Sequence, residues 1–290
     1  MEHRTGSVVG ARGAELFWQC WRVPQPRAIL VVVHGLGEHS GRYQNVVDAL
    51  EGLPLSIWAL DLRGFGRSTG QRGHLDSFWD YMEDLDCLLE QVRAEEEDIP
   101  VFLLGHSFGG LVALHYAICR PGLLAGLVLS SPCLGLSLRV PRWKHKAGML
   151  LARLLPRFSM SSGLDPALLS HDAEVVQRYR RDPLVTDRVS ARLYVEMLSA
   201  MERVARRAVQ LEAPCLFLLA GADGLLSVPV AQNVFVRLGS RDKELRVYPG
   251  YFHELFNEEG KEEPLGALRQ WLERHLWEST RRAGLAVPPG

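Results

Sequence analysis

The sequence contains no long hydrophobic run and no excess of one charge. Its longest apolar stretches, such as residues 28–33, are far shorter than the roughly 20 residues that span a bilayer. The formal net charge is -1, which excludes a strongly basic nucleic-acid binder and an acidic tail. Any electrostatic contribution to function must therefore come from a local patch.

Cysteine is scarce and irregularly placed. The cysteines are odd in number and lack CxxC spacing, which argues against a disulfide framework and a zinc site. They are Cys20, Cys87, Cys119, Cys133 and Cys215. The opening residues, 1–13, also lack the apolar core of a secretory signal. We therefore expect a soluble, cytoplasmic protein that binds no metal.

The chain does contain a repeated rhythm of short apolar runs and longer segments of helical period. Continuous hydrophobicity is typical of strands buried on both faces, as in a parallel sheet covered by helices. The predicted parallel strands are residues 28–33, 55–60, 101–104, 126–129, 215–220 and 245–248. The predicted helices are residues 77–96, 107–119, 228–238 and 262–277. With antiparallel strands at 7–9 and 16–21, this pattern indicates a doubly wound, mostly parallel α/β fold.

One stretch interrupts the rhythm. Residues 133–200 show no buried-strand run and contain helix-like segments divided by proline and glycine. We interpret them as a helical cap inserted into the core, and such insertions usually cover a site. The predicted organisation is a core formed by residues 1–132 and 201–290 with a cap at 133–200.

The pentapeptide Gly105 to Gly109 (GHSFG) carries the first chemical signal. A G-x-S-x-G pattern alone arises by chance in about one chain in ten of this length. Here a predicted strand precedes it and a predicted helix follows it, which is the setting of a nucleophile elbow. The strained turn exposes the hydroxyl of Ser107, and side chains at 105 and 109 would collide with neighbouring backbone.

A serine nucleophile needs a base and a carboxylate that orients the base. In hydrolases with this elbow the order is Ser, Asp or Glu, then His, each after a core strand. Asp223 is the first carboxylate after the strand at 215–220, and His253 follows the strand at 245–248. The sequence therefore predicts Ser107, Asp223 and His253 as a catalytic triad on an α/β-hydrolase fold.

The same chemistry requires backbone N–H donors for the oxyanion of the tetrahedral intermediate. Phe108, the residue after the nucleophile, supplies one predicted donor. The glycine-rich loop after the strand at 28–33 supplies the other, at Leu36, and we expect His34 to brace that loop. We expect Asp61 and Arg63 to brace the next loop rather than to act in catalysis.

With these residues identified, the sequence resembles the monoacylglycerol lipase and lysophospholipase branch of the α/β hydrolases. The matching segments extend over most of the chain, and HGLGEHSGRY is the most specific of them. They are residues 34–43 (HGLGEHSGRY), 61–68, 105–110, 179–185 (YRRDPLV) and 249–253. Members commonly have Met after the nucleophile, whereas this chain has Phe108, which leaves its acyl chain-length preference open.

The resemblance implies hydrolysis of an ester that joins one fatty acyl chain to a small polar alcohol, without a cofactor. It also implies an apolar acyl channel under the cap. The polar head of the substrate is then expected near Glu38, Arg42 and Tyr179.

Residues 134–164 of the predicted cap contain no acidic residue, but several basic residues alternate with apolar ones. Such a segment suits transient docking on an anionic lipid surface. It is equally typical of a cap that packs its leucines on the core and leaves its charges in solvent. The sequence leaves both readings open.

Other functions are compatible with the same fold. An aminopeptidase or a thioesterase uses the same triad and differs only in its pocket. A binding protein of the hydrolase fold would usually have lost a triad member, and none is lost here. We therefore expect a serine ester hydrolase, with monoacylglycerols as its substrates.

Overall fold

A mostly parallel sheet forms the centre of the protein. The computed structural model describes residues 1–96, 99–137 and 142–282, without the side chains of 142–147 and 277–282. Within these residues eight strands form one sheet in the order β1-β2-β4-β3-β5-β6-β9-β10. The strands are β1 (Glu2–Val9), β2 (Glu15–Arg22), β3 (Ala28–Val33), β4 (Leu55–Leu60), β5 (Val101–His106), β6 (Gly126–Ser130), β9 (Cys215–Ala220) and β10 (Lys243–Tyr248).

The pairing confirms the predicted fold class. β1 pairs with β2 and β2 with β4 in antiparallel fashion, and every other neighbouring pair is parallel. All six residues of β3 are buried. Val31 and Val33 belong to the core on one face, whereas Leu30 and Val32 belong to the core on the other. A strand with two buried faces has no polar side, which is why its hydrophobic run is continuous.

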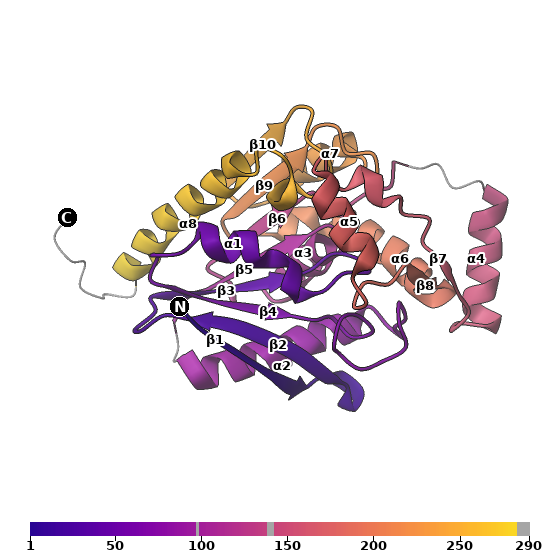
Figure 1. Cartoon of the computed structure of the whole chain (residues 1–290), viewed down its shortest axis with the longest axis horizontal. Helices are drawn as coiled ribbons and strands as arrows, with labels where there is room; N and C mark the ends of the chain where they lie inside the picture. Colours follow the sequence, from indigo (N-terminus) through magenta and orange to yellow (C-terminus); the bar gives the residue numbers. More distant parts are fainter. Residues whose placement is uncertain (97–98, 138–141, 283–290) are drawn as a thin grey trace.

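Helices cover both faces of the sheet (Figure 1). One core includes residues of α2 (Trp79–Glu96), α3 (Phe108–Cys119) and α7 (Val228–Arg237), and the other includes residues of α1 (Gln44–Ala49) and α8 (Glu262–Arg282). Four of these helices lie where the sequence predicts them. The short helix α1 was not predicted, because six residues are too few to show a helical period.

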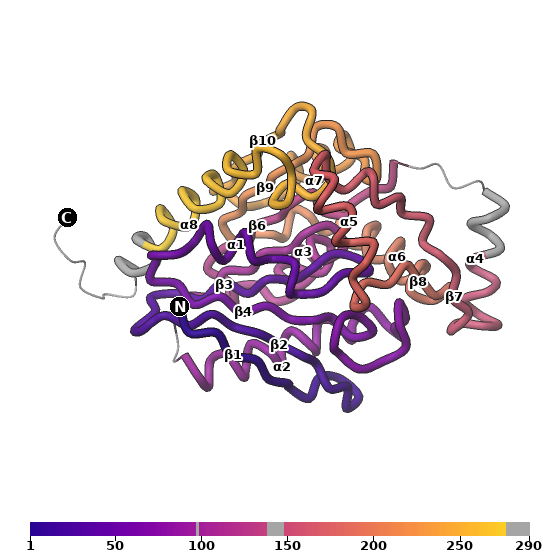
Figure 2. Tube along the Cα trace, viewed as in Figure 1, coloured from indigo at the N-terminus to yellow at the C-terminus, as the bar shows by residue number. Residues whose placement is uncertain are grey.

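The insertion that the sequence predicts as a cap lies between β6 and β9. It contains α4 (Arg142–Leu154), β7 (Ser159–Ser161), α5 (Ala173–Arg181), β8 (Arg188–Ser190) and α6 (Ala191–Arg207). The antiparallel pair of β7 and β8 was not predicted, because strands of three residues are too short to show an alternating hydrophobic pattern. Helix α6 continues past the predicted boundary at residue 200. Figure 2 shows this insertion on the side of the molecule opposite to the N-terminus and to α8.

Asp61 and Arg63 fix the loop that follows β4. The carboxylate of Asp61 accepts hydrogen bonds from the backbone N–H groups of Ser40 and Arg67, both at 2.7 Å. Arg63 makes two hydrogen bonds to Asp84 on α2, at 2.6 and 2.7 Å, and the Asp84 side chain is 1% exposed. The loop is therefore braced by both residues, and the Asp61 contact joins it to the neighbouring loop after β3.

We expect Arg63→Ala to lower the free energy of unfolding by about 3–5 kcal/mol, because it leaves the buried Asp84 carboxylate without its partner. Removal of an exposed partner, Arg206→Ala beside Glu202, is expected to cost less than about 1 kcal/mol. Urea unfolding followed by circular dichroism measures both. Equal effects of the two variants would contradict a structural role for the Arg63 pair.

Candidate active site

Ser107 occupies a strained turn between β5 and α3. Its backbone angles are φ 53° and ψ -119°, a conformation that L-residues rarely adopt. A Cβ atom at Gly105 would lie 2.4 Å from the carbonyl oxygen of Gly109, and one at Gly109 would lie 2.1 Å from that of Val33. The backbone is held on both sides, because the N–H of Ser107 donates to Ser130 and its carbonyl accepts from Cys133. The turn therefore has the geometry of a nucleophile elbow.

Asp223 and His253 form a buried hydrogen-bonded pair. His253 Nδ1 lies 2.7 Å from Asp223 Oδ2, and the two side chains are 3% and 2% exposed. The other oxygen, Asp223 Oδ1, accepts from the backbone N–H groups of Leu225 and Leu226, both at 2.9 Å. A carboxylate accepts only, so Nδ1 carries the proton. Nε2 of His253 is then the nitrogen that can exchange a proton with Ser107, since both residues line the same cavity.

The surroundings separate the pKa values of two neighbouring histidines. Burial lowers the pKa of His253, but the Asp223 carboxylate outweighs it and leaves the pKa above its ordinary value. Burial and the adjacent His253 lower the pKa of His106 to about 4. The two rings lie 4.9 Å apart, and His106 Nδ1 lies 3.1 Å from the carbonyl oxygen of Ser130. His106 therefore stays neutral, and His253 is the basic member of the pair.

The two backbone N–H groups predicted as oxyanion donors belong to residues that lie beside the same cavity as Ser107. Leu36 and Phe108 both line the cavity that contains Ser107. Within the described part of the chain neither N–H group donates a hydrogen bond, whereas the N–H of Gly35 is engaged by Glu38 Oε1 at 2.5 Å. The imidazole of His34 accepts from the N–H of Leu62 and contacts the carbonyl oxygen of Gly35. His34 thus braces the loop, as the sequence predicts.

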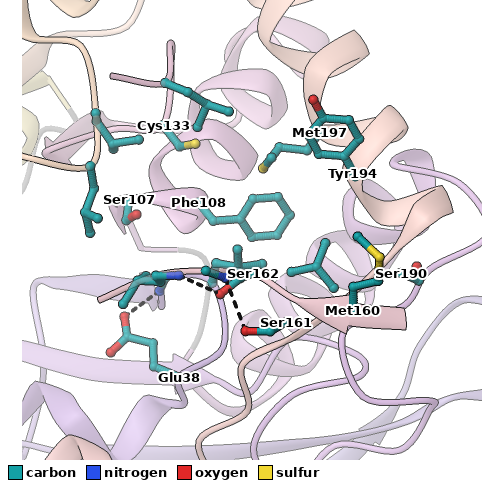
Figure 3. A pocket seen from close by; sticks show the side chains of 18 of the residues that line it. Glu38, Ser107, Phe108, Cys133, Met160, Ser161, Ser162, Ser190, Tyr194 and Met197 are labelled. Atoms are coloured by element: carbon teal, nitrogen blue, oxygen red, sulfur yellow. Dashed lines mark hydrogen bonds between the residues drawn. The ribbon is translucent and has the colours of Figure 1, made fainter. Parts of the chain in front are cut away.

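A cavity of about 650 Å³ lies between the core and the cap and contains Ser107. This volume is within the range of small-ligand sites. Figure 3 shows Glu38 and Ser107 on one side and Tyr194, Met160 and Met197 on the other. We call the side with Glu38 and Ser107 the polar side; the rest of the lining is mostly apolar. The cavity therefore suits a ligand with one polar end and an extended apolar body.

Phe108 lines the cavity, and its ring also packs against the core. The side chain is fully buried, and its ring meets those of Phe78 and Tyr81 edge to face at 6.0 and 5.7 Å. The ring is therefore a fixed part of the cavity wall rather than a mobile side chain.

The predicted substrate-binding residues form a charged network at the polar side of the cavity. Arg42 donates to Glu38 at 2.7 Å and to both carboxylate oxygens of Glu254 at 2.6 and 2.8 Å. Its guanidinium lies over the ring of Tyr179, 4.8 Å from the centroid. Glu38, Tyr179 and Glu254 line the main cavity, whereas Arg42 lines a small neighbouring one. Burial opposes the Glu38 charge, but Arg42 and nearby histidines lower its pKa to about 2.

Sequence reasoning missed two members of this network, Glu254 and Tyr43. The Tyr43 hydroxyl donates to Glu38 Oε1 at 2.8 Å. Both residues adjoin segments that the sequence singles out, because Glu254 follows His253 and Tyr43 ends the HGLGEHSGRY segment. Their position next to predicted site residues was the available signal.

The described residues hold no group of three or more metal-ligating side chains placed to bind a metal ion. Among the same residues, no helix has the length and hydrophobicity that crossing a membrane requires.

Fold and site together define a serine hydrolase of the α/β-hydrolase fold. The model of the serine aminopeptidase S33 family matches residues 24–260. The chain therefore belongs to this family, and it is a monoglyceride lipase-like member of the lipase and esterase type.

Three relatives illustrate the similarity. Human monoglyceride lipase is 35% identical over 97% of this chain and 93% of its own length. A phospholipase of Bacillus subtilis is 33% identical over 88% of this chain and 99% of its own. The crystal structure of Paleococcus ferrophilus monoacylglycerol lipase is similar with a TM-score of 0.84 and 38% identity, covering 90% of this chain and 99% of that one.

We expect activity to rise with pH through the raised pKa of His253, because only the neutral imidazole accepts a proton. Asp223→Asn removes the charge that raises this pKa, so the acid limb of the kcat/KM profile moves to lower pH. The rate itself falls about 10⁴-fold, because the amide that replaces the carboxylate can donate to Nδ1 and hold the imidazole in the wrong tautomer. Ester hydrolysis followed across about pH 4–9 measures both the position of the acid limb and the fall in rate.

Asp242→Asn is the matched control, because Asp242 pairs with His275 at 3.0 Å outside the cavity. It should leave the profile unchanged. An acid limb that stays in place in Asp223→Asn would contradict the assignment of His253 as the titrating base.

Proposed function

We propose that the protein hydrolyses fatty acyl esters of small polar alcohols, above all monoacylglycerols, through an acyl-enzyme intermediate. One observation carries the proposal: Ser107, with the His253–Asp223 pair, lies at the polar side of a large and otherwise apolar cavity. The similarity to monoglyceride lipases over nearly the whole chain supports it. The reaction needs no cofactor, since every step is a proton transfer or an acyl transfer between protein groups, substrate and water.

In the proposed mechanism the Ser107 hydroxyl attacks the ester carbonyl carbon while His253 Nε2 takes its proton. The Asp223 carboxylate stabilises the imidazolium that forms. The N–H groups of Leu36 and Phe108 bind the oxyanion, and loss of such a donor typically costs about 2.7–4 kcal/mol of barrier. His253 then protonates the leaving alcohol, and water releases the fatty acid by the same steps in reverse.

The cavity suggests how each part of the substrate binds. The acyl chain extends along the apolar side toward Met160, Tyr194 and Met197, away from Ser107 (Figure 3). The alcohol head lies near Glu38 and Tyr179, with Arg42 holding Glu38 from behind. Phe108 is fixed against the core, so its ring limits the acyl pocket at a constant position.

The charges at the polar side weigh against the aminopeptidase alternative. A substrate with a free ammonium group needs an available carboxylate, and both Glu38 and Glu254 are already held by Arg42. A peptide backbone would also leave its polar groups unsatisfied against the apolar lining. A thioesterase uses the same groups and the same acyl channel, so a thioester stays the alternative substrate. A non-catalytic binding protein would have no need of a strained serine beside a paired histidine.

We expect a fluorophosphonate probe to label the wild type and not Ser107→Ala. For p-nitrophenyl esters kcat/KM should rise about fourfold per added CH₂ until the acyl pocket is full, because each buried CH₂ contributes about 0.8 kcal/mol. Long-chain monoacylglycerols should be cleaved and aminoacyl amides should not. Absent labelling of the wild type, or equal labelling of Ser107→Ala, would end the serine hydrolase proposal.

We also propose that the cap docks transiently on a lipid surface and that the protein is a cytoplasmic enzyme peripheral to membranes. Its large exposed apolar side chains gather at the end of α4 and beyond, and two of them, Phe158 and Met160, also line the cavity. The others are Met149, Leu150, Leu154 and Leu155. The exposed Arg153 and Arg157 stand beside them and suit anionic headgroups. The basic residues predicted at 139–146 lie outside the side chains that the structure describes.

We expect Leu154→Ser with Leu155→Ser to weaken binding to anionic vesicles at least about tenfold, because each leucine contributes on the order of 1.5 kcal/mol or more when buried in lipid. Val209→Ser with Val236→Ser is the control, since these valines are similarly exposed but follow α6, the last helix of the insertion, in the chain. Co-sedimentation measures both. Equal binding by the two double variants would refute docking through the cap.

A further inference from the structure

One segment of the cap touches both loops that carry the proposed catalytic groups. We call residues 168–186 the clamp segment, residues 34–42 the oxyanion loop and residues 249–258 the histidine loop. Figure 1 shows α5, which belongs to the clamp segment, above the sheet, whereas α4 lies at the periphery. The two parts of the cap therefore have different neighbours and need not share one role.

Against the oxyanion loop the clamp segment makes a backbone contact. The N–H of Thr186 donates to the carbonyl oxygen of Gly37 at 2.8 Å. Gly37 has φ +81°, and a Cβ atom there would lie 2.3 Å from the carbonyl oxygen of Thr186. This contact lies one residue from Leu36, whose N–H is a proposed oxyanion donor. A shift of the clamp segment would therefore move that donor.

A side-chain pair strengthens the same contact. His39 Nε2 donates to Asp182 Oδ2 at 2.8 Å, since Nδ1 of the same ring accepts from the N–H of Gly41. Asp182 is itself fixed, because its Oδ1 accepts from the N–H of Leu184 at 2.9 Å. The His39 side chain is 8% exposed, so the pair is largely shielded from water. Asp182 belongs to the YRRDPLV segment, to which the mechanism assigns only Tyr179.

On the histidine loop the clamp segment meets a buried carboxylate. Glu258, whose side chain is 1% exposed, accepts from the N–H of Phe252 at 2.8 Å and from the N–H of His171 at 2.8 Å. Ser170 Oγ lies 3.1 Å from the same carboxylate. Phe252 immediately precedes His253, so Glu258 joins the backbone at the proposed base to the start of α5.

The backbone of the histidine loop adds further contacts. The N–H of His253 donates to the carbonyl oxygen of Leu168 at 3.4 Å, and the N–H of Glu254 donates to that of Leu169 at 2.8 Å. The proposed base is thus held from the cap side as well as by Asp223.

We infer that Asp182 and Glu258 are positioning residues, and that the clamp segment sets the geometry of the oxyanion hole and of His253. The inference rests on the proposed function. Under it, this part of the cap belongs to the catalytic framework. Misplacement of a reacting group by about 1 Å can cost about 100-fold in rate, so small displacements at either contact are measurable.

The test of the oxyanion contact is Asp182→Ala. We expect kcat for p-nitrophenyl esters to fall about 10–100-fold while KM changes by less than about twofold. Affinity for an alkyl boronic acid, whose tetrahedral adduct places an oxygen in the oxyanion hole, should fall in parallel. Affinity for a nonhydrolysable alkyl glycerol ether should not change. Asp182→Asn keeps an oxygen that accepts from His39, so it should restore part of the rate.

Asp172→Ala is the matched control. Asp172 caps the other end of α5 by accepting from the N–H of Glu174, and it contacts neither catalytic loop. It should lower the melting temperature without lowering kcat. In a double-mutant cycle, His39→Ala with Asp182→Ala should cost no more than either single change, because both remove one interaction.

The test of the histidine contact is Glu258→Gln, and it has a different signature. An alkoxide must be protonated by His253 as it leaves, whereas p-nitrophenolate leaves without a proton. Glu258→Gln should therefore slow alkyl esters more than p-nitrophenyl esters, and Asp182→Ala should slow both alike.

The outcomes separate the two proposals. If the wild type neither reacts with the fluorophosphonate nor cleaves esters, the proposed function fails. If the wild type is active but Asp182→Ala and Asp172→Ala reduce kcat equally, or Asp182→Ala leaves kcat unchanged, the positioning role fails. Should Asp182→Ala not fold, His39→Ala replaces it, because it removes the same hydrogen bond from the other side, and wild-type kcat in that variant would overturn the inference.

Discussion

The strained backbone at Ser107 is the constraint on which the rest of the structure depends. A serine at φ 53° is held only if the chain around it leaves no alternative. Two glycines admit neighbouring backbone at distances that no side chain allows. Ser107 donates a backbone hydrogen bond to Ser130 of β6 and accepts one from Cys133, and these fix the turn. β5 lies inside the sheet between β3 and β6, so loops that follow strands on both sides of it lie near its carboxyl end.

Buried charge is tolerated around the site only in compensated form. The Asp223 carboxylate is balanced by His253 and two backbone N–H groups, and Arg42 lies between two glutamates. Burial opposes the charges of Asp223, Glu38 and Arg42, and their partners outweigh that penalty. The polar side of the cavity is thus fixed in both charge and geometry before any substrate arrives, which is the condition for electrostatic stabilisation of a transition state.

The sequence predicts those features that are encoded within a few neighbouring residues. The continuous apolar runs reveal the parallel strands, and the strand–turn–helix setting of Ser107 reveals the elbow. Contacts between distant segments leave no such trace. His39 and Asp182 are 143 positions apart, and His171 and Glu258 are 87 apart. The HGLGEHSGRY and YRRDPLV segments both stand out by their resemblance to the family, but a single sequence gives no indication that they touch. The pair of β7 and β8 leaves no trace either, because three residues per strand are too few to show a hydrophobic pattern.

The contact between Thr186 and Gly37 also has a consequence for how such chains diverge. Recombination often exchanges an inserted domain between relatives as one independent module. Here an exchanged cap would meet a foreign loop at Gly37, where no side chain fits, and a foreign partner at Glu258. Three segments far apart in the gene would therefore have to be inherited together, and new specificities would arise more readily by changes within α4 than by replacement of the whole insertion.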